Sequence, residues 1–411
     1  MSEFRNISDL LNLDKVAEKF FGEMIADDMK LKMDPSQYGN QHHTSIQHYL
    51  VKMLHKILTE LDGTKGGNFA VVASLIDWKE AFPRQCPRLG VEAFLKMGVR
   101  PSLIPMLINF FQGRKMQVKW HGKFSEVKHL NGSGPQGSTI GLLEYLAQSN
   151  NNADTVGEEE RFKFLDDLSI LEVVNLLTIG ISTYDFKQHV ASDIPEGSGF
   201  VEAYNLKSQN YINDISDWTK NQKMKLNLNK SNIMIFNPSK KYKFTTRVKM
   251  QDHTLPVITK TKLLGTIITD DLKWNENTRK IVKQANQRLQ ILRKSTEFTS
   301  SIDDLKTIYI AYVRSILEQS SVLWGSSLTD ENKCDLERVQ KNSCRIILGE
   351  RYENYENALK EICLETLEER RKVLALKFGN NCLYNVKTQN LFPSIYKKFF
   401  VCPLRFFQLE T

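Results

Sequence analysis

The sequence has no apolar run that approaches the ~20 residues needed to cross a lipid bilayer. Its first residues, Met1 to Arg5, lack the hydrophobic segment of a signal peptide. The six cysteines include no Cys-x-x-Cys pair, and no histidine follows His253, so the spacing typical of a zinc finger is missing. No internal repeat is evident. These absences predict an intracellular protein, in the cytoplasm, the nucleus or both, whose cysteines are free thiols.

The composition is that of an ordinary globular protein. Hydrophobic residues make up 41% and charged residues 25% of the 411 residues, which is enough chain for two or three domains. Basic residues outnumber acidic ones by 56 to 48, which gives a net charge of +8. That excess permits a polyanionic partner but does not prove one.

The most informative stretch is Arg161 to Glu172. Phe162 and Phe164 alternate with other side chains before a pair of carboxylates, and a second alternating run follows. This pattern predicts two short strands joined by a tight turn with Asp166 and Asp167 at its tip. Adjacent carboxylates repel each other unless a cation lies against them. The pair is therefore either a solvated acidic turn or half of a divalent-metal site suited to Mg²⁺.

A second carboxylate ends a run of a different kind. The segment from Phe69 to Ile76 is nearly all apolar, as expected for a strand buried on both faces, and Asp77 follows it directly. A rigid strand that ends in an acid is a common way to hold a metal ligand. The same Asp77 could instead cap a helix that begins nearby. Both interpretations stand on the sequence alone.

A glycine-rich loop extends from Asn131 to Gly141 and leads into a predicted helix. Gly132, Gly134 and Gly137 match the spacing of a dinucleotide-binding fingerprint, but a predicted hairpin precedes the loop and no βαβ unit follows, so we reject that interpretation. A loop of this kind still lets backbone N–H groups approach a nucleotide or phosphodiester closely. A plain linker is the alternative.

The remaining pattern is mixed and then helical. Hydrophobic spacing predicts a mixed α/β region before about residue 275 and a helical domain rich in lysine and arginine after it. The predicted elements are helices over 1–33, 44–61, 89–112 (two, broken at 98–101) and 211–223; a hairpin at 115–128 turning at His121-Gly122; a partly helical insertion over 175–205; a turn with Lys230 before a strand; a strand over 263–268; and helices over 277–295, 303–319 and 331–348.

Together these segments resemble the palm of reverse transcriptases, specifically those of non-LTR (LINE-type, jockey-like) retrotransposons. The resemblance covers most of the chain and rests on motifs that occur in the family's order. The matching stretches are Arg5-Asn6-Ile7-Ser8 and Ser36-Gln37-Tyr38-Gly39 in the fingers; Asp77 to Phe82 (motif A), Pro135-Gln136-Gly137 (motif B), Phe164-Leu165-Asp166-Asp167 (motif C), Lys230 (motif D) and Leu264-Gly265 (motif E) in the palm; and Ile316 to Trp324 beyond it.

The sequence departs from the family pattern in several places. Motif A shifts its lysine to Lys79 and ends in Pro83, and Asn6 stands where the first motif usually has proline. The residue before Asp166 is leucine, which favours reverse transcriptases over viral RNA-dependent RNA polymerases, where glycine is usual. No endonuclease precedes the first motif and the first fingers segment is missing, so we expect an N-terminally truncated element.

The resemblance implies an α+β fold, the right-hand polymerase. Residues 1–68 would form partial fingers, and residues 69–274 a palm with an antiparallel sheet, flanking helices and the insertion near 175–205. Residues 275–411 would form a mostly helical, thumb-like region. Its basic helices would bind a primer–template backbone, although basic faces are more often simply solvated.

The resemblance also implies the chemistry, which is RNA-directed DNA synthesis by two-metal phosphoryl transfer. Two Mg²⁺ ions about 3.5–4 Å apart, with Mn²⁺ as an alternative, would activate the primer hydroxyl and hold the triphosphate. The partners would be an RNA template, a DNA primer and deoxynucleotides. The implied roles are Asp77 and Asp166 as metal ligands, with Asp167 in support and the Trp78 backbone carbonyl as a further oxygen; Gln136 and Gly137 for nucleotide and template; Lys230 for pyrophosphate; Arg5 for the triphosphate; Phe82 for the sugar pocket; and Leu264 and Gly265 for primer positioning.

Two alternatives remain at this stage. The chain could be a catalytically silent or domesticated remnant that binds nucleic acid through its basic helices. Phe82 could be a core residue, because aromatic side chains are most often buried for packing. The retained acids favour the enzyme, and the expected truncation favours the remnant.

Overall fold

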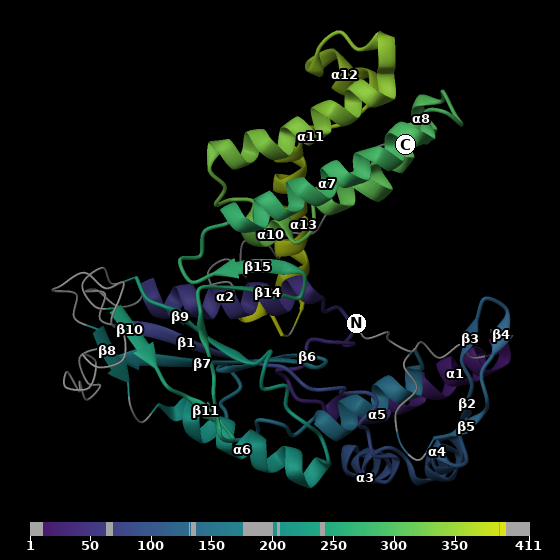
Figure 1. Cartoon of the computed structure of the whole chain (residues 1–411), viewed down its shortest axis with the longest axis vertical. Coiled ribbons are helices and arrows are strands. Elements are labelled where there is room, and N and C mark those ends of the chain that lie inside the picture. The colour runs from purple at the N-terminus through teal and green to yellow at the C-terminus, as the bar shows by residue number, and fades with distance from the viewer. Residues whose placement is uncertain are drawn as a thin grey trace. The chain divides into compact units, whose positions relative to one another are not determined.

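The structure is a computed structural model of the whole chain, shown in Figure 1. It describes residues 11–62, 69–130, 132, 137–175, 200–203, 206–238, 243–385 and 387–391, with side chains left out at 200–203 and 243–244. The chain forms two compact units, one of Met1–Gln41 with Glu60–Ile258 and the other of His42–Thr59 with Thr259–Thr411. The predicted division into fingers, palm and thumb-like region stays a prediction.

The first unit is built around a five-stranded sheet in the order β13-β9-β1-β7-β6. The central pairs are antiparallel, and only the short β13 runs parallel to its neighbour β9. The strands are β1 (Phe69–Ile76), β6 (Arg161–Phe164), β7 (Asp167–Asn175), β9 (Asn232–Phe236) and β13 (Val257–Ile258). Strand β1 is buried along almost its whole length, which confirms the prediction from its continuous apolar run.

Helices pack beside and beneath this sheet (Figure 1). One core joins the sheet to α6 through Ile212 and Ile215, and a second core joins α1, α3, α4 and α5 through residues such as Phe94 and Leu107. The helices and 3-10 turns of the first unit are α1 (Asn12–Met29), η1 (Lys30–Lys32), α3 (Pro87–Met97), η2 (Pro101–Leu103), α4 (Ile104–Phe111), α5 (Thr139–Ser149) and α6 (Lys207–Gln222).

Short strands complete the first unit. Four of them form an arm at the right of Figure 1, whose tip turns at His121-Gly122 as predicted. The arm strands are β2 (Lys115–Met116), β3 (Lys119–Trp120), β4 (Lys123–Phe124) and β5 (Lys128–His129). The others are β8 (Phe200–Ala203), β10 (Lys243–Thr246), β11 (Lys249–Met250) and β12 (His253–Thr254).

The second unit is mostly helical and includes most of α2. Its core contains large buried side chains such as Trp324 and Tyr309, and the long helices α7 and α11 pack against each other. Its elements are α2 (Ile46–Asp62), β14 (Lys260–Leu263), β15 (Thr266–Thr269), α7 (Asn275–Ser295), α8 (Ile302–Ile308), a π-helical segment (Tyr309–Arg314), α9 (Ser315–Leu317), α10 (Ser321–Trp324), α11 (Asp330–Leu348), η5 (Gly349–Arg351), α12 (Tyr355–Ile362), α13 (Leu367–Tyr384) and η6 (Gln389–Leu391).

The α+β class predicted from the sequence is confirmed, with an antiparallel-rich sheet, flanking helices and a helical C-terminal region. One local prediction was wrong. The strand expected over 263–268 is a hairpin, because Leu264 and Gly265 adopt left-handed φ angles of 45° and 88° and turn the chain between β14 and β15. The partly helical insertion expected over 175–205 stays a prediction, because residues 176–199 lie outside the described residues and only the strand β8, at 200–203, is described there.

The helices in the part of the chain that the structure describes were compared with the length and hydropathy of membrane-spanning helices. None of these described helices combines the length and the apolar character that crossing a bilayer requires.

Candidate active site

The acidic hairpin predicted from the sequence is present as β6 and β7. Leu165 and Asp166 form its two-residue turn, while Asp167 is the first residue of β7 and pairs with Phe164. The prediction that both carboxylates lie at the tip was therefore wrong for Asp167. Leu165 has a left-handed φ of 55°, which is unfavourable for a leucine, and its side chain packs against the helical core. Packing holds this leucine where a glycine would fit the backbone better.

Asp77 lies beside this hairpin, at the end of the neighbouring strand. Strands β1 and β7 pair in a register whose last recorded pair is Ile76 with Leu168, so the next residues in that register are Asp77 and Asp167. Helix α3 begins only at Pro87, with Cys86 as its N-cap. Asp77 therefore does not cap that helix, which removes the structural alternative left open by the sequence.

Two polar residues that the sequence did not single out hold Asp77 in place. The side-chain amide of Asn227 donates a 2.8 Å hydrogen bond to Asp77 Oδ2, and the backbone N–H of Asp77 donates to Ser231 Oγ at 3.1 Å. Both belong to the turn before β9, and Lys230 lies in the same turn with an exposed side chain. The only signal in the sequence was their proximity to Lys230.

The backbone around Trp78 is tied to the same turn. Trp78 bridges Leu226, and the hydrogen bonds of that bridge are made by its neighbours, from Asn227 N–H to the Asp77 carbonyl and from Lys79 N–H to the Lys225 carbonyl. The Trp78 carbonyl takes no part in these bonds. This turn therefore does not engage the Trp78 carbonyl, which belongs to the residue directly after Asp77.

The three carboxylates act on one another through their charges. Burial, then the charge of Asp166 and then that of Asp77 raise the pKa of Asp167 to about 7. Burial and the charges of all three carboxylates also raise the pKa of the Tyr145 hydroxyl well above its ordinary value. In the described part of the chain, however, no three or more His, Cys, Asp or Glu side chains converge closely enough to form a metal site. The acids thus interact electrostatically without meeting at one point.

A loop segment, Ser36 to Gly39, supports the hairpin turn from the outer edge of the sheet. Gln37 bridges Lys163 of β6, and its side-chain oxygen accepts hydrogen bonds from the backbone N–H groups of Leu165 at 3.0 Å and Gly39 at 2.8 Å. A Cβ placed on Gly39 would lie 2.6 Å from the backbone nitrogen of Leu165. Only glycine permits this close approach to the turn.

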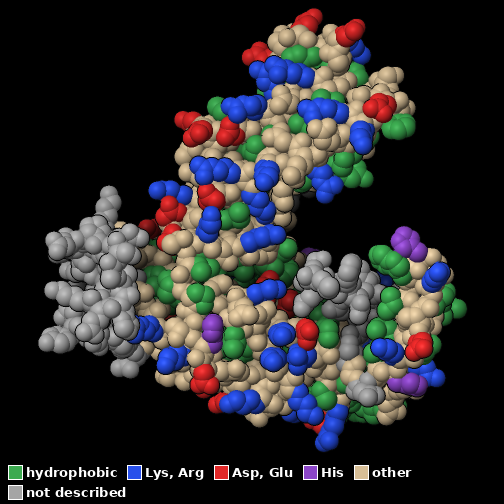
Figure 2. All heavy atoms as spheres, in the orientation of Figure 1, with side chains coloured by type: hydrophobic (Ala, Val, Ile, Leu, Met, Phe, Trp, Pro, Cys, Tyr) green, Lys and Arg blue, Asp and Glu red, His purple; other side chains and the backbone are tan. Residues whose placement is uncertain are grey.

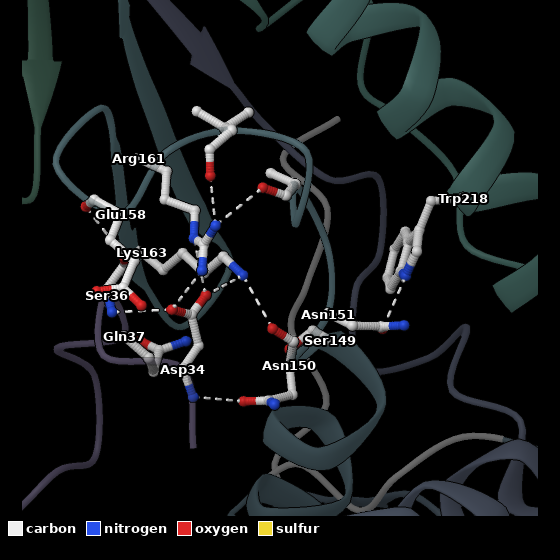
Figure 3. Close-up of polar contacts among 12 residues, drawn as sticks. Asp34, Ser36, Gln37, Ser149, Asn150, Asn151, Glu158, Arg161, Lys163 and Trp218 are labelled. Carbon is white, nitrogen blue, oxygen red and sulfur yellow. Dashed lines mark hydrogen bonds and ion pairs between the residues drawn. The ribbon is translucent and has the colours of Figure 1, made fainter. Parts of the chain in front are cut away.

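A buried ion cluster holds the same segment, as Figure 3 shows. Asp34 accepts two hydrogen bonds from the Arg161 guanidinium, at 3.1 and 3.2 Å, and lies 2.5 Å from Lys163 Nζ. Burial opposes the charge of Asp34, but both cations outweigh it and hold the pKa of that carboxyl below its ordinary value. The remaining donors reach the Val156 and Asn150 carbonyls. The cluster therefore fixes the loop against strand β6.

Replacing Gln37 with leucine tests this support. We expect Gln37→Leu to lower the free energy of unfolding by about 2 kcal/mol, because the buried amide of Gly39 and the partly buried amide of Leu165 lose their acceptor. The Leu165 amide should also exchange its hydrogen faster. Denaturant unfolding and amide hydrogen exchange measure both effects. Gln112→Leu, on an exposed glutamine after α4, is the control and should change neither. Unchanged exchange at Leu165 would show that Gln37 does not hold the turn.

Phe82 packs against the core of the central sheet, next to Tyr145. Its ring is half-buried and stacks on Tyr145, with centroids 5.2 Å apart and planes 29° apart. The charges of all three acids contribute to the raised pKa of Tyr145, so the ring on which Phe82 stacks belongs to a residue that interacts with them. The packing of Phe82 against the sheet core also agrees with a purely structural role.

The start of helix α5, where the glycine-rich loop ends, is already occupied. Ser138 is the N-cap, and Glu18 of α1 accepts hydrogen bonds from the Ser138 hydroxyl at 3.0 Å and the Thr139 N–H at 2.9 Å. The Thr139 amide is therefore not available to a phosphate. Gly137 is exposed, with a φ of 95°, while residues 131 and 133–136 of the loop, including Gln136, lie outside the described residues.

The structure does not relate the other predicted site residues to these carboxylates. Arg5 lies outside the described residues. Leu264 and Gly265 form the β14–β15 turn of the second unit, where the Gly265 carbonyl accepts a hydrogen bond from Lys280. Of the predicted set, Asp77, Trp78, Asp166, Asp167, Phe82 and Lys230 share one end of the central sheet.

Comparison with known proteins bears on the family that the sequence resembles. No protein-family model matches the chain. Over 358 residues the chain is 21% identical to a probable RNA-directed DNA polymerase from transposon X-element of Drosophila melanogaster. The match covers 85% of this chain and 36% of that protein, so the chain spans about a third of the relative's length. This similarity confirms the predicted resemblance to reverse transcriptases of non-LTR retrotransposons.

Solved telomerase structures are also similar. The apo telomerase of Candida tropicalis, truncated from its C-terminal domain, has a TM-score of 0.40 at 11% identity, covering 63% of this chain and 44% of that one. A Candida tropicalis telomerase in complex with the TWJ fragment of telomeric RNA has a TM-score of 0.41 at 9% identity, covering 92% and 56%. The chain spans about half the length of these telomerases.

Proposed function

We propose that this chain is an RNA-directed DNA polymerase of a non-LTR retrotransposon, acting inside the cell. The proposal rests on one observation: Asp77, Asp166 and Asp167 lie near one another at the ends of adjoining antiparallel strands, where burial and the charges of the other two acids raise the pKa of Asp167 to about 7. Carboxylates held together in this way are costly unless a cation neutralises them. A rigid sheet that carries this cost is suited to a site for divalent metal.

The donor chemistry fits Mg²⁺, since the groups are carboxylates with a backbone carbonyl beside them. We propose that Asp77 and Asp166 hold two such ions, with Asp167 in support and the Trp78 carbonyl as a further oxygen. When bound, the metals would lower the pKa of the primer hydroxyl and neutralise the phosphates. The chain's own part is orientation: Asn227 fixes the Asp77 carboxylate, Ser231 fixes its backbone, and the turn beside Gln37 fixes Asp166.

Other residues would bind the substrates, which are an RNA template, a DNA primer and deoxynucleotides. Lys230 is in the turn that anchors Asp77, so its exposed ammonium is suited to pyrophosphate. We further propose Gln136 and Gly137 for nucleotide and template, Arg5 for the triphosphate, and Leu264 and Gly265 for the primer. The division into partial fingers (1–68), palm (69–274) and thumb-like region (275–411) belongs to the same proposal.

The direct experiment is Mg²⁺-dependent extension of oligo-dT on poly-rA by the purified chain. Extension that requires both the RNA template and the metal supports the proposal. Retained binding to nucleic acid with no extension under any metal would instead favour a catalytically silent remnant.

Phe82 provides a prediction about the sugar. An aromatic side chain packed under the nucleotide C2′ would exclude a 2′-hydroxyl, so Phe82→Val should raise ribonucleotide incorporation roughly tenfold while deoxynucleotide incorporation stays largely intact. Single-nucleotide extension kinetics measure the ratio. Phe94→Val, at a fully buried core position of α3, is the control and should not change it. An equal loss for both sugars would make Phe82 a core residue.

A further inference from the structure

The arm formed by β2 to β5 is unusual because no other described part of the chain covers its tip. Every residue from Gln117 to His129 is exposed, and the side chains of Trp120 and Phe124 are 67% and 60% accessible. A two-stranded hairpin is marginally stable in water, and large aromatic side chains on its surface add an unfavourable contact with solvent. The exposure of these two rings is therefore better explained by binding to another molecule than by stabilisation of the fold.

The arm pairs each aromatic ring with a lysine. Lys119 lies opposite Phe124, with its Nζ 5.5 Å from the ring centroid, and Trp120 lies opposite Lys123. Side chains of successive residues point to opposite faces of a strand, so each face of the tip carries one ring and one ammonium group. His121 packs edge-on against Trp120 at 5.0 Å. In Figure 2, hydrophobic, basic and histidine side chains lie next to one another in this region, at the right of the view.

The charge of the arm is strongly positive. Glu126 is its sole acidic residue, against the lysines at 115, 119, 123 and 128. Within the described residues, none of these lysines forms an ion pair with a carboxylate. Their charge is therefore available to an external anion.

We propose that this arm binds single-stranded nucleic acid, with bases stacking on Trp120 and Phe124 and phosphates lying against the neighbouring lysines. Aromatic faces with interleaved cations are the combination that takes up unpaired strands without sequence preference. A protein partner fits less well, because the apolar area is interrupted by a lysine beside each ring. This site is distinct from the carboxylates and requires neither metal nor polymerisation.

Binding can therefore be measured independently of activity. The assay uses the full-length chain in EDTA, without nucleotides, and follows the fluorescence anisotropy of labelled single-stranded RNA and DNA 20-mers of mixed sequence. Replacing both Trp120 and Phe124 with leucine keeps the apolar area but removes the π faces, and should weaken binding about tenfold or more. Replacing both with tyrosine should restore it. Val127→Ala, on the same arm, is the matched control and should leave binding within about twofold of wild type.

The lysines provide a second readout. Replacing Lys119 and Lys123 with glutamine should lower the slope of log affinity against log salt by about 1.4, since each phosphate contact with a single strand releases counterions. Equal affinity of the leucine and wild-type proteins would overturn the proposal. The proposal would also be overturned if the leucine variant lost only binding to anionic lipid vesicles, or only self-association, while its oligonucleotide binding stayed intact. A wild-type chain that binds these oligonucleotides but shows no primer extension would instead count against the polymerase proposal alone.

Discussion

Asp166→Asn should abolish primer extension, with a loss of at least ~10³-fold, by comparison with the removal of other groups that stabilise developing charge. The amide keeps the size of the side chain and its place in the turn between β6 and β7, but it cannot supply the negative charge that holds Mg²⁺. The measurement is Mg²⁺-dependent extension of oligo-dT on poly-rA by purified wild-type and mutant chains. Thermal unfolding should show that the mutant remains folded.

The chain offers a closely matched control in the hairpin of β11 and β12. Its turn is Gln251-Asp252, and Gln251 has a left-handed φ of 56°, close to the 55° of Leu165. Asp252→Asn therefore makes the same chemical change in a similar turn, away from Asp77. It should leave extension unchanged. Equal activity of Asp166→Asn and wild type would refute the metal assignment, and inactivity of all three proteins would favour the silent remnant.

Elements with strong local signals were predicted well from the sequence. Strand β1 follows from a continuous apolar run, and the β6–β7 hairpin follows from alternation around two acids. The arm turn at His121-Gly122 was predicted from the glycine, and both residues have positive φ angles. In these cases the residues that decide the backbone are next to one another in the chain.

The predictions failed where a distant contact decides the outcome. Leu165 is left-handed although leucine disfavours that conformation, because Gln37 binds its amide and the helical core binds its side chain. That shifts the turn by one residue and moves Asp167 into β7. Leu264-Gly265 looked like part of a strand because its neighbours are apolar, and only the glycine hinted at the turn.

The supporting residues of the site could not be found by pattern. Asn227 and Ser231 reach Asp77 across about 150 positions of sequence separation, since the turn before β9 folds back onto the end of β1. Short polar residues near a turn have many ordinary roles, such as local hydrogen bonds to the backbone. The contribution of Asn227 and Ser231 to the site can be recognised only once the position of β1 relative to their turn is known.

Glu144 is another residue whose environment the sequence pattern did not reveal. It lies inside helix α5 between apolar neighbours, is fully buried, and has no hydrogen-bond partner for either carboxylate oxygen among the described residues. Helix α3 comes so close that a Cβ on Gly90 would lie 2.4 Å from its Oε1. Burial raises the pKa of Glu144 from 4.5 to about 8, and the nearby Arg114 opposes this only in part.

This raised pKa makes the stability of the protein depend on pH. Between pH 4.5 and about 8 the unfolded chain has released the Glu144 proton while the folded chain still holds it, so the free energy of unfolding falls as pH rises through that range. The fall is on the order of 5 kcal/mol, at about 1.4 kcal/mol per pH unit. Above pH 8 both states are ionised and this contribution becomes constant.

Glu144→Gln removes the ionisation and should remove this fall. At pH 5 the mutant should match the wild type or be about 1–3 kcal/mol less stable, since the amide is also buried without partners. At pH 8.5 it should be the more stable protein, because only the wild type must bury a charge. Urea unfolding at several pH values measures the difference, with Glu23→Gln on the exposed face of α1 as the control. Parallel pH profiles for Glu144→Gln and wild type would mean that Glu144 is neutralised by a charged partner rather than by a proton. In that case Glu144 of α5 would form a buried ion pair instead of remaining a neutral acid.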